Sequence, residues 1–225
     1  MANRAGKSAI GSYLGASFAR QICVDHPTSG WVVSLDFPMS RDTIQPYYFD
    51  NGFGVGTKPF IPDYEIAKFD KQAQTLFLKN GSIVSFKSCD SGPTKFQGAG
   101  KDWIHKDEVI PKVIDDEISI RVQAGKPLIQ WTTATLLPPE GHSGNVHWIY
   151  QDIVKPWKLG DRLRHITNAS IYDNPHIRAE ELSSLEARYP PGSMSRRIRM
   201  DGELLPGISG SLVYGAFAHE THVAP

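Results

Sequence analysis

Two short clusters of charged and hydroxyl residues have the composition of a site that handles phosphates. The first is Gly6-Lys7-Ser8, at the start of a predicted helix. In a phosphate-binding loop, backbone N–H groups at a helix N-terminus surround the phosphate oxygens, a Lys neutralises the terminal phosphates, and a Ser or Thr hydroxyl holds Mg²⁺. Met1 stands where the usual pattern has its first Gly. A chance Gly-Lys-Ser at a helix start is therefore the alternative interpretation.

The second cluster is the acidic pair Asp107-Glu108, which follows the strand-like run Trp-Ile-His-Lys. In enzymes that combine a phosphate-binding loop with such an acidic pair, the first carboxylate holds magnesium and the second polarises the attacking water. The His and Lys make this strand more polar than usual, and a solvated strand end is the alternative. Because ligand sites of parallel α/β sheets lie outside the carboxyl ends of the strands, we expect Asp107 and Glu108 to lie near Lys7.

The elements that would position these clusters alternate between helix and strand. Apolar spacing predicts helices over 6–22, 112–123, about 143–153, about 178–188 and about 193–200. Residues rich in β-formers predict strands over 31–36, 65–69, 74–79, 82–88, 103–106, 127–133 and about 163–168. Asn80-Gly81 indicates a hairpin. Together they predict an α/β fold with a mostly parallel sheet, helices on both faces and an antiparallel hairpin extension.

Composition narrows the possible functions. The chain of 225 residues carries 24 Lys and Arg against 24 Asp and Glu, which argues against a histone-like or repressor-like DNA binder. Cys23 and Cys89 have neither metal-ligand nor disulfide-framework spacing, so a reducing compartment is expected. No apolar run is long enough to predict a membrane span. Several further residues are interpreted as packing or surface residues and not as ligands: His105, His142, His147, His165, Tyr47, Tyr48 and Phe49.

Further motifs follow in a fixed order. Residues 94–111 read TKFQGAGKDWIHKDEVIP, residues 128–135 read LIQWTTAT, residues 173–175 read DNP, and residues 196–203 are rich in Arg and end in Gly-Glu. Together with the loop Ala-Asn-Arg-Ala-Gly-Lys-Ser, this order resembles the ATPase domain of phage terminase large subunits over roughly residues 2–223. Taken singly, the Thr-rich strand exit, the Asn-rich loop and the Arg group have ordinary structural explanations.

The resemblance implies an additional-strand P-loop NTPase fold that hydrolyses ATP with Mg²⁺ and couples hydrolysis to movement of double-stranded DNA. The implied catalytic residues are Lys7, Arg4 and Glu108. The implied metal ligands are Ser8 and Asp107. The implied nucleotide-binding residues are Asn3, Arg4, Ala5, Gly6, Lys7 and Ser8 in the loop, with Thr132, Thr133 and Thr135 beside the γ-phosphate.

The same resemblance implies a portal protein, a small terminase subunit and sibling motor subunits in a ring as partners, in the host cytoplasm. Residues 1–203 would form the ATPase domain, and 204–225 a linker toward a nuclease domain. The nuclease carboxylates are not visible, so the chain is not expected to cut DNA. It begins inside the loop, without the preceding strand and adenine-binding segment, which predicts a poor ATPase. The alternatives are a non-catalytic terminase fragment and a superfamily 2 helicase-like ATPase, which would need a second RecA-like domain.

Overall fold

A computed structural model describes residues 5–53, 56, 58–98, 100–121, 128–136 and 148–204. Six strands form one sheet in the order β2-β3-β4-β1-β5-β6. The strands are β1 (Ser29–Ser34), β2 (Ile66–Asp70), β3 (Thr75–Leu78), β4 (Ile83–Ser88), β5 (Trp103–Asp107) and β6 (Ile129–Thr133). Strands β4, β1, β5 and β6 run parallel, whereas β2 and β3 are antiparallel neighbours at one edge. The predicted mixed sheet, with its hairpin at Asn80-Gly81, is confirmed.

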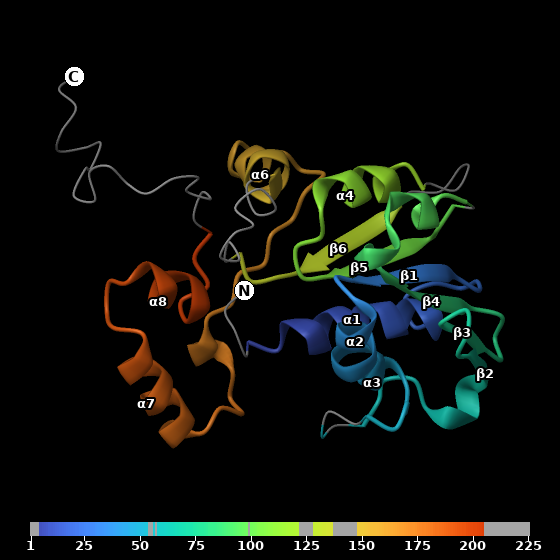
Figure 1. The fold of residues 1–225 in the computed structure, drawn as a ribbon, viewed down its shortest axis with the longest axis horizontal. Helices are drawn as coiled ribbons and strands as arrows, with labels where there is room; N and C mark the ends of the chain where they lie inside the picture. Colours follow the sequence, from blue (N-terminus) through green and yellow to red (C-terminus); the bar gives the residue numbers. More distant parts are fainter. Residues whose placement is uncertain are drawn as a thin grey trace.

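Helices cover both faces of this sheet, as predicted (Figure 1). On one face lie α1 (Lys7–Ala19), α2 (Phe37–Met39) and α3 (Gln45–Tyr48), and on the other lies α4 (Lys112–Ser119). A π-helical turn over Ser40–Ile44 joins α2 to α3. The Asp36 carboxylate accepts a hydrogen bond from the Met39 N–H at 2.6 Å, and the proline after Phe37 suits a first helical turn.

Strand alternation sends neighbouring side chains of one strand into two different cores. Val32 packs with α1 and α3 on one face, whereas Trp31 and Val33 pack against α4 on the other. Tyr48 and Phe49 are buried in the first core, where Phe49 lies against Phe69 and Phe86. The interpretation of these aromatic residues as packing residues is confirmed.

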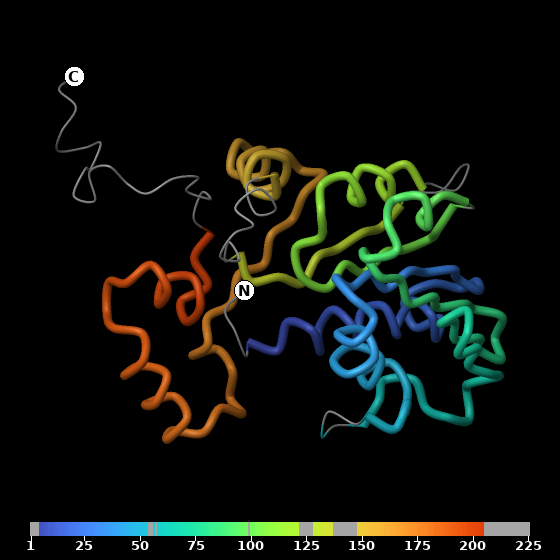
Figure 2. The backbone as a smooth tube through the Cα atoms, in the orientation of Figure 1, coloured from blue at the N-terminus to red at the C-terminus, as the bar shows by residue number. Residues whose placement is uncertain are grey.

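The C-terminal part adds two helical regions, one around α6 (Lys155–Lys158) near the end of the sheet and a separate layer formed by α7 (Ala179–Arg188) and α8 (Met194–Arg199). A π-helical turn over Tyr150–Val154 continues into α6. The last two helices enclose a small core around Ile171 and Met200, and Ala5 packs against it. The chain just before α1 therefore lies beside this layer (Figure 2).

Two predicted elements differ from the structure. The strand expected at about 163–168 is wrong, since these residues pair with no described strand; Leu163 is exposed and Ile166 packs on the cluster around Trp148. The helix expected over 112–123 ends at Ser119, where the Arg121 N–H donates to the Ile118 carbonyl at 2.9 Å in a tighter turn; residues 122 and 123 lie outside the described residues.

Two other regions bear on the predicted boundaries. The helix predicted to end at about residue 153 continues to Lys158, while 143–147 and the linker after residue 204 lie outside the described residues. Within the described part of the chain, none of the helices has the length and apolar character needed to cross a bilayer.

Candidate functional site

Helix α1 begins at the Gly-Lys-Ser motif. Gly6 has φ 75°, a left-handed conformation that a glycine adopts without steric cost, and Lys7 opens the helix directly after it. Farther along α1, a Cβ placed on Gly11 would lie 2.5 Å from His105 Nε2. The absence of a side chain at this position allows α1 to lie against β5, so that Lys7 and Ser8 approach the carboxyl end of that strand.

The acidic pair stands at that end, on a strained backbone. Glu108 has φ 66°, in the left-handed region, where a residue with a Cβ is disfavoured by roughly 1–2 kcal/mol. Its N–H donates to the Thr133 carbonyl at 2.8 Å, which holds the strained turn against β6. Strain of this kind is found where a site needs a particular side-chain direction. Here it directs the Glu108 carboxylate toward α1.

Glu108 joins the loop to the Thr-rich strand exit. Lys7 Nζ donates to Glu108 Oε1 in a short ion pair. The other carboxylate oxygen, Oε2, accepts a hydrogen bond from the Thr135 N–H at 3.2 Å. The carboxylate of Glu108 therefore contacts both segments that the resemblance expects beside a terminal phosphate.

Asp107 is buried immediately behind this pair and is only 2% exposed. Its Oδ1 accepts hydrogen bonds from Ser8 Oγ at 3.2 Å and from Thr133 Oγ1 at 2.9 Å. Burial, followed by the nearby charge of Glu108, raises the pKa of Asp107 to about 6, although Thr133, Lys7 and Ser8 act in the opposite direction. The negative charge of this carboxylate is therefore only partly compensated.

A histidine that the sequence did not assign to the site lies behind Asp107. His105 is fully buried; its Nε2 lies 2.9 Å from Thr133 Oγ1 and its Nδ1 lies 3.1 Å from the Tyr48 hydroxyl. Burial lowers the pKa of His105 to about 3, so the ring is neutral. Alternation along β5, which puts positions 105 and 107 on one face, is the signal that could have placed it.

The structure therefore brings most of the expected residues together. Those whose side chains or backbone groups meet are Lys7, Ser8, Asp107, Glu108, Thr133 and Thr135. Ala5 and Gly6 form the turn before α1. Thr132 is aligned with Lys106, whereas Thr133 is aligned with Asp107, so Thr132 faces the other side of the sheet and does not join the cluster. Asn3 and Arg4 lie outside the described residues.

The donor set matches the chemistry of magnesium. Mg²⁺ prefers carboxylate and hydroxyl oxygens in sites that leave room for phosphate and water. Ser8 Oγ and Asp107 Oδ1 provide such oxygens 3.2 Å apart, and the negative charge of the Asp107 carboxylate is only partly compensated. The residues present thus fit the ion that the motifs imply.

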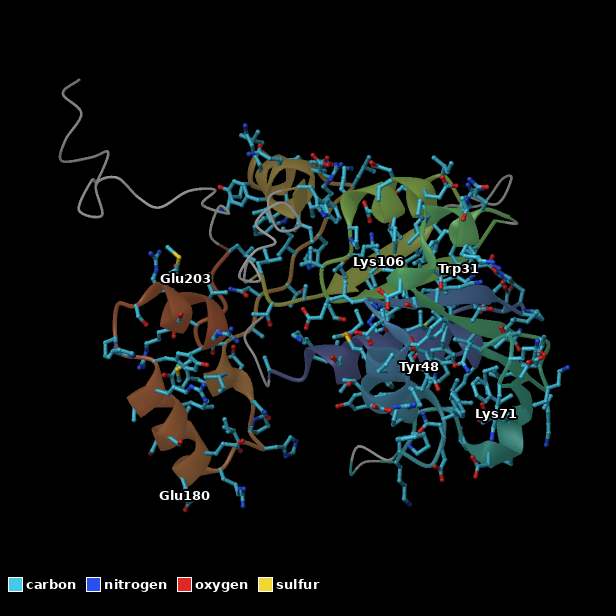
Figure 3. The ribbon with its side chains drawn as sticks, in the orientation of Figure 1. Trp31, Tyr48, Lys71, Lys106, Glu180 and Glu203 are labelled. Atoms are coloured by element: carbon cyan, nitrogen blue, oxygen red, sulfur yellow. The ribbon has the colours of Figure 1, made fainter. Side chains whose placement is uncertain are left out.

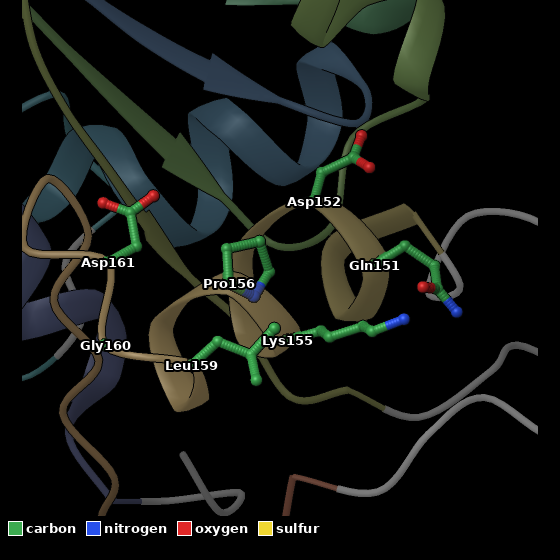
Figure 4. A pocket seen from close by; sticks show the side chains of 7 residues that line it. All are labelled: Gln151, Asp152, Lys155, Pro156, Leu159, Gly160 and Asp161. Carbon is green, nitrogen blue, oxygen red and sulfur yellow. The ribbon is translucent and has the colours of Figure 1, made fainter.

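A separate hollow of about 690 Å³ lies around α6 and the turn after it (Figure 4). Its lining consists of Gln151, Asp152, Lys155, Pro156, Leu159, Gly160 and Asp161. None of these residues comes from α1, β5 or β6. The convergence of charged groups at Lys7 and Glu108, and not the size of a hollow, therefore locates the candidate site.

The fold is that of a P-loop NTPase. It has a mostly parallel sheet, a phosphate-type loop that opens a helix, and an acidic pair at the carboxyl end of a neighbouring strand. Within that class, the chain belongs to the family described as terminase large subunit, T4-like virus type, N-terminal, which matches residues 1–211. No match was found among curated proteins.

Solved structures of the large terminase from a thermophilic bacteriophage have the same fold. The ADP complex matches with a TM-score of 0.68 at 14% identity, over 100% of this chain and 51% of that one. The ATP-γ-S complex matches with a TM-score of 0.64 at 14% identity, over 100% and 50%. A third structure of that terminase has a TM-score of 0.63 at 13% identity, over 100% and 51%. The chain thus spans about half the length of these proteins.

Proposed function

We propose that this chain is the ATPase motor domain of a phage terminase large subunit, which hydrolyses ATP with Mg²⁺ and couples that reaction to the packaging of double-stranded DNA into a capsid. The observation that carries the proposal is the contact of Lys7 on α1 with Glu108, whose strained backbone at the end of β5 directs its carboxylate to the loop. Family membership supports the proposal, as do the structures of the thermophilic phage terminase with ADP and ATP-γ-S.

Nucleotide binding would open the Lys7–Glu108 pair. A terminal phosphate carries more negative charge than one carboxylate and competes for the Lys7 ammonium. Lys7 is 14% exposed and Glu108 26% exposed, so both side chains can be reached from solvent. Binding would therefore free the Glu108 carboxylate at the moment when the phosphate arrives beside it.

Hydrolysis would then use Glu108 as the general base. A water oxygen attacks the γ-phosphorus, the bond from that phosphorus to the β–γ bridging oxygen breaks, and the water proton passes to the Glu108 carboxylate. Ser8 and Asp107 would hold Mg²⁺, which when bound supplies positive charge to the phosphate oxygens. Thr133 and Thr135 contact Asp107 and Glu108 and would sense loss of the γ-phosphate.

The partners of this motor are proposed from the family. They are double-stranded DNA, a portal protein, a small terminase subunit and further copies of the motor in a ring, in the cytoplasm of the host. The neutral charge balance fits a protein that holds DNA transiently through a few loops, because a permanent binder needs a strongly positive face.

Two substitutions separate binding from hydrolysis. Glu108→Gln should leave the affinity for Mg·ATP largely intact and slow phosphate release by about 100-fold or more, since it removes a positioned base. Lys7→Ala should weaken binding itself, because it removes a charge-assisted contact to the phosphates. Titration calorimetry with Mg·ATP-γ-S measures binding, and a phosphate-release assay measures turnover.

Glu180→Gln is the matched control, because Glu180 is an exposed carboxylate on α7 (Figure 3). It should behave as the wild-type chain does in both assays. Equal turnover of Glu108→Gln and wild type would reject Glu108 as the base. Binding of Mg·ATP-γ-S without any turnover in the wild-type chain would favour a non-catalytic domain.

A further inference from the structure

A continuous chain of buried hydrogen bonds runs from α3 to the acidic pair. The Tyr48 hydroxyl lies 3.1 Å from His105 Nδ1, and His105 Nε2 lies 2.9 Å from Thr133 Oγ1. Thr133 Oγ1 in turn lies 2.9 Å from Asp107 Oδ1. All four residues are less than 9% exposed. The chain therefore reaches Asp107 through protein groups alone.

The direction of every bond in this chain follows from its Asp107 end. An ionised carboxylate only accepts, so the single hydroxyl proton of Thr133 points to Asp107 Oδ1. The Thr133 oxygen must then accept from His105, which requires a proton on Nε2. A neutral imidazole with a proton on Nε2 has a bare Nδ1, which accepts from the Tyr48 hydroxyl.

The His105 ring is packed against Trp131 and against Gly11 of α1. Trp131 stacks on it with ring centres 5.5 Å apart and an interplanar angle of 14°. The Trp131 indole N–H also donates to the Gly11 carbonyl of α1 at 3.2 Å, and Gly11 itself leaves the space for the ring. Segments from α1, β5 and β6, which carry the loop, the acidic pair and the Thr-rich exit, thus meet around one imidazole.

We propose that His105, held as the neutral Nε2–H tautomer by Tyr48, is a positioning residue that aims the Thr133 hydroxyl at Asp107 and so fixes the carboxylate for a divalent cation. The Mg²⁺ part of this inference rests on the proposed function, whereas the tautomer does not. His105 touches neither phosphate nor metal in this account; it acts through Thr133. Outer partners of metal ligands typically change metal affinity by about 10–100-fold when removed.

The first test reads the tautomer directly. Long-range ¹H–¹⁵N spectra of the full chain, labelled at histidine, should show one neutral His105 with the proton on Nε2 at neutral pH. Loss of a signal in His105→Gln assigns it, and perturbation of the same signal by Tyr48→Phe and Thr133→Val assigns it independently if His105→Gln does not fold. A proton on Nδ1, or a doubly protonated ring, would overturn the proposal.

The second test measures the affinity for ATP-γ-S with and without Mg²⁺. His105→Phe should lower the Mg²⁺-dependent part of binding by about 10-fold, with binding in EDTA unchanged. Thr133→Val should lower the Mg²⁺-dependent part by at least as much. The double variant should bind no worse than Thr133→Val alone, since His105 acts through that hydroxyl. Thr133→Ser keeps the hydroxyl and should recover most of the Mg²⁺-dependent affinity that Thr133→Val loses.

The matched control is Thr75→Val, which removes a similarly buried hydroxyl from β3. It should leave Mg²⁺-dependent binding unchanged. Losses that multiply in the double variant, or that are equal with and without Mg²⁺, would assign His105 a purely structural role. If the wild-type chain binds no nucleotide at all, the proposed function fails, and the spectra still decide the tautomer.

Discussion

Two lysine–carboxylate pairs lie at β5, on different sides of the strand, and they differ in burial and in backbone conformation. Lys7–Glu108 lies at the carboxyl end of the strand, with side chains 14% and 26% exposed. Lys106–Asp115 lies on the α4 face, with side chains 4% and 10% exposed and a separation of 2.6 Å. Figure 3 shows Lys106 on the opposite side of the sheet from Tyr48, which belongs to the site network.

The buried lysine, Lys106, has polar partners on two elements, whereas the more exposed Lys7 could exchange its carboxylate partner for another anion. Lys106 Nζ also donates to Gln130 Oε1 at 3.0 Å, so it ties β5 to α4 and β6. Glu108 is instead held on a left-handed backbone, and its lysine partner is accessible to an anion. Exposure and backbone strain, not the presence of a lysine and a carboxylate, therefore distinguish the pair proposed to act in catalysis from the structural one.

The largest expected effect comes from breaking the buried pair. Lys106→Met leaves Asp115 buried without its cation and should lower the free energy of unfolding by about 3–5 kcal/mol in urea denaturation. Lys7→Met removes a cation from a carboxylate that water can reach and should cost far less. Lys106→Met combined with Asp115→Leu should recover most of the loss, because a well-packed apolar pair often replaces an ion pair. Equal losses for Lys106→Met and Lys7→Met would erase the distinction between the pairs.

The next prediction concerns the buried charge of Asp107, which lies beside the Lys7–Glu108 pair. The folded pKa of Asp107, about 6, lies above its ordinary value of 3.8 because of burial. The folded chain then binds this proton more tightly than the unfolded chain, so the group opposes folding above about pH 6, and its opposition fades toward about pH 4. Asp107→Asn should therefore stabilise the fold at pH 7.5, by at most about 3 kcal/mol.

Urea denaturation of Asp107→Asn and the wild type between about pH 4.5 and about pH 8 measures this difference across the window set by the two pKa values. The advantage of the variant should shrink steadily as the pH falls through about 6. An advantage that does not change with pH would show that Asp107 titrates normally. An Asp107→Asn chain less stable than wild type at every pH would show that hydrogen bonding outweighs the buried charge.

Local sequence signals predicted the elements and the ends of the strands, because they depend on spacing within a few residues. Gly-Lys-Ser before a helical run, Asn80-Gly81 between strands and the acidic pair after β5 are all signals of this kind. Parallel strand order then places Lys7 near Glu108. The bond between Tyr48 and His105 joins residues 57 positions apart and depends on packing, which no local pattern encodes.

The helices over 37–48, which the sequence did not predict, and the mistaken strand near 163–168 have a related cause. The region over 37–48 has prolines at positions 38 and 46. Proline has a low helix propensity, so the sequence does not indicate a helix there. Both prolines stand in first helical turns, where proline is tolerated. The apolar residues near 163–168 suggest a strand, but Ile166 finds its contacts on the cluster around Trp148 without any described strand partner. The spacing of apolar residues indicates which side chains are buried. Tertiary contacts decide whether a helix, a strand or a loop buries them.

A third effect separates backbone strain from side-chain chemistry at Glu108. Glu108→Gly and Glu108→Ala both remove the carboxylate and the pair with Lys7, but only glycine relieves the left-handed backbone. The glycine variant should therefore be more stable than the alanine variant by roughly 1–2 kcal/mol. Thermal or urea denaturation of the two variants measures the difference, and both should lack hydrolysis. If alanine proves as stable as glycine, the backbone at this position is not strained in solution.

The smallest effect is expected at a pair with better geometry but no functional position. Arg20, directly after α1, holds Glu65 through two hydrogen bonds, Nε to Oε2 at 2.7 Å and a second nitrogen to Oε1 at 2.6 Å, with side chains 27% and 25% exposed. The hydrogen bond from Arg20 holds the pKa of Glu65 below its ordinary value. Its contribution to stability is therefore present above about pH 4.5 and lost as the pH falls through the lowered pKa.

Because solvent screens the pair, Glu65→Gln should cost no more than about 1 kcal/mol at neutral pH. The cost should vanish in strong acid, where wild type and variant converge in urea denaturation. A cost that matched the loss in Lys106→Met would show that geometry outweighs burial, and would contradict the ranking of the pairs by exposure.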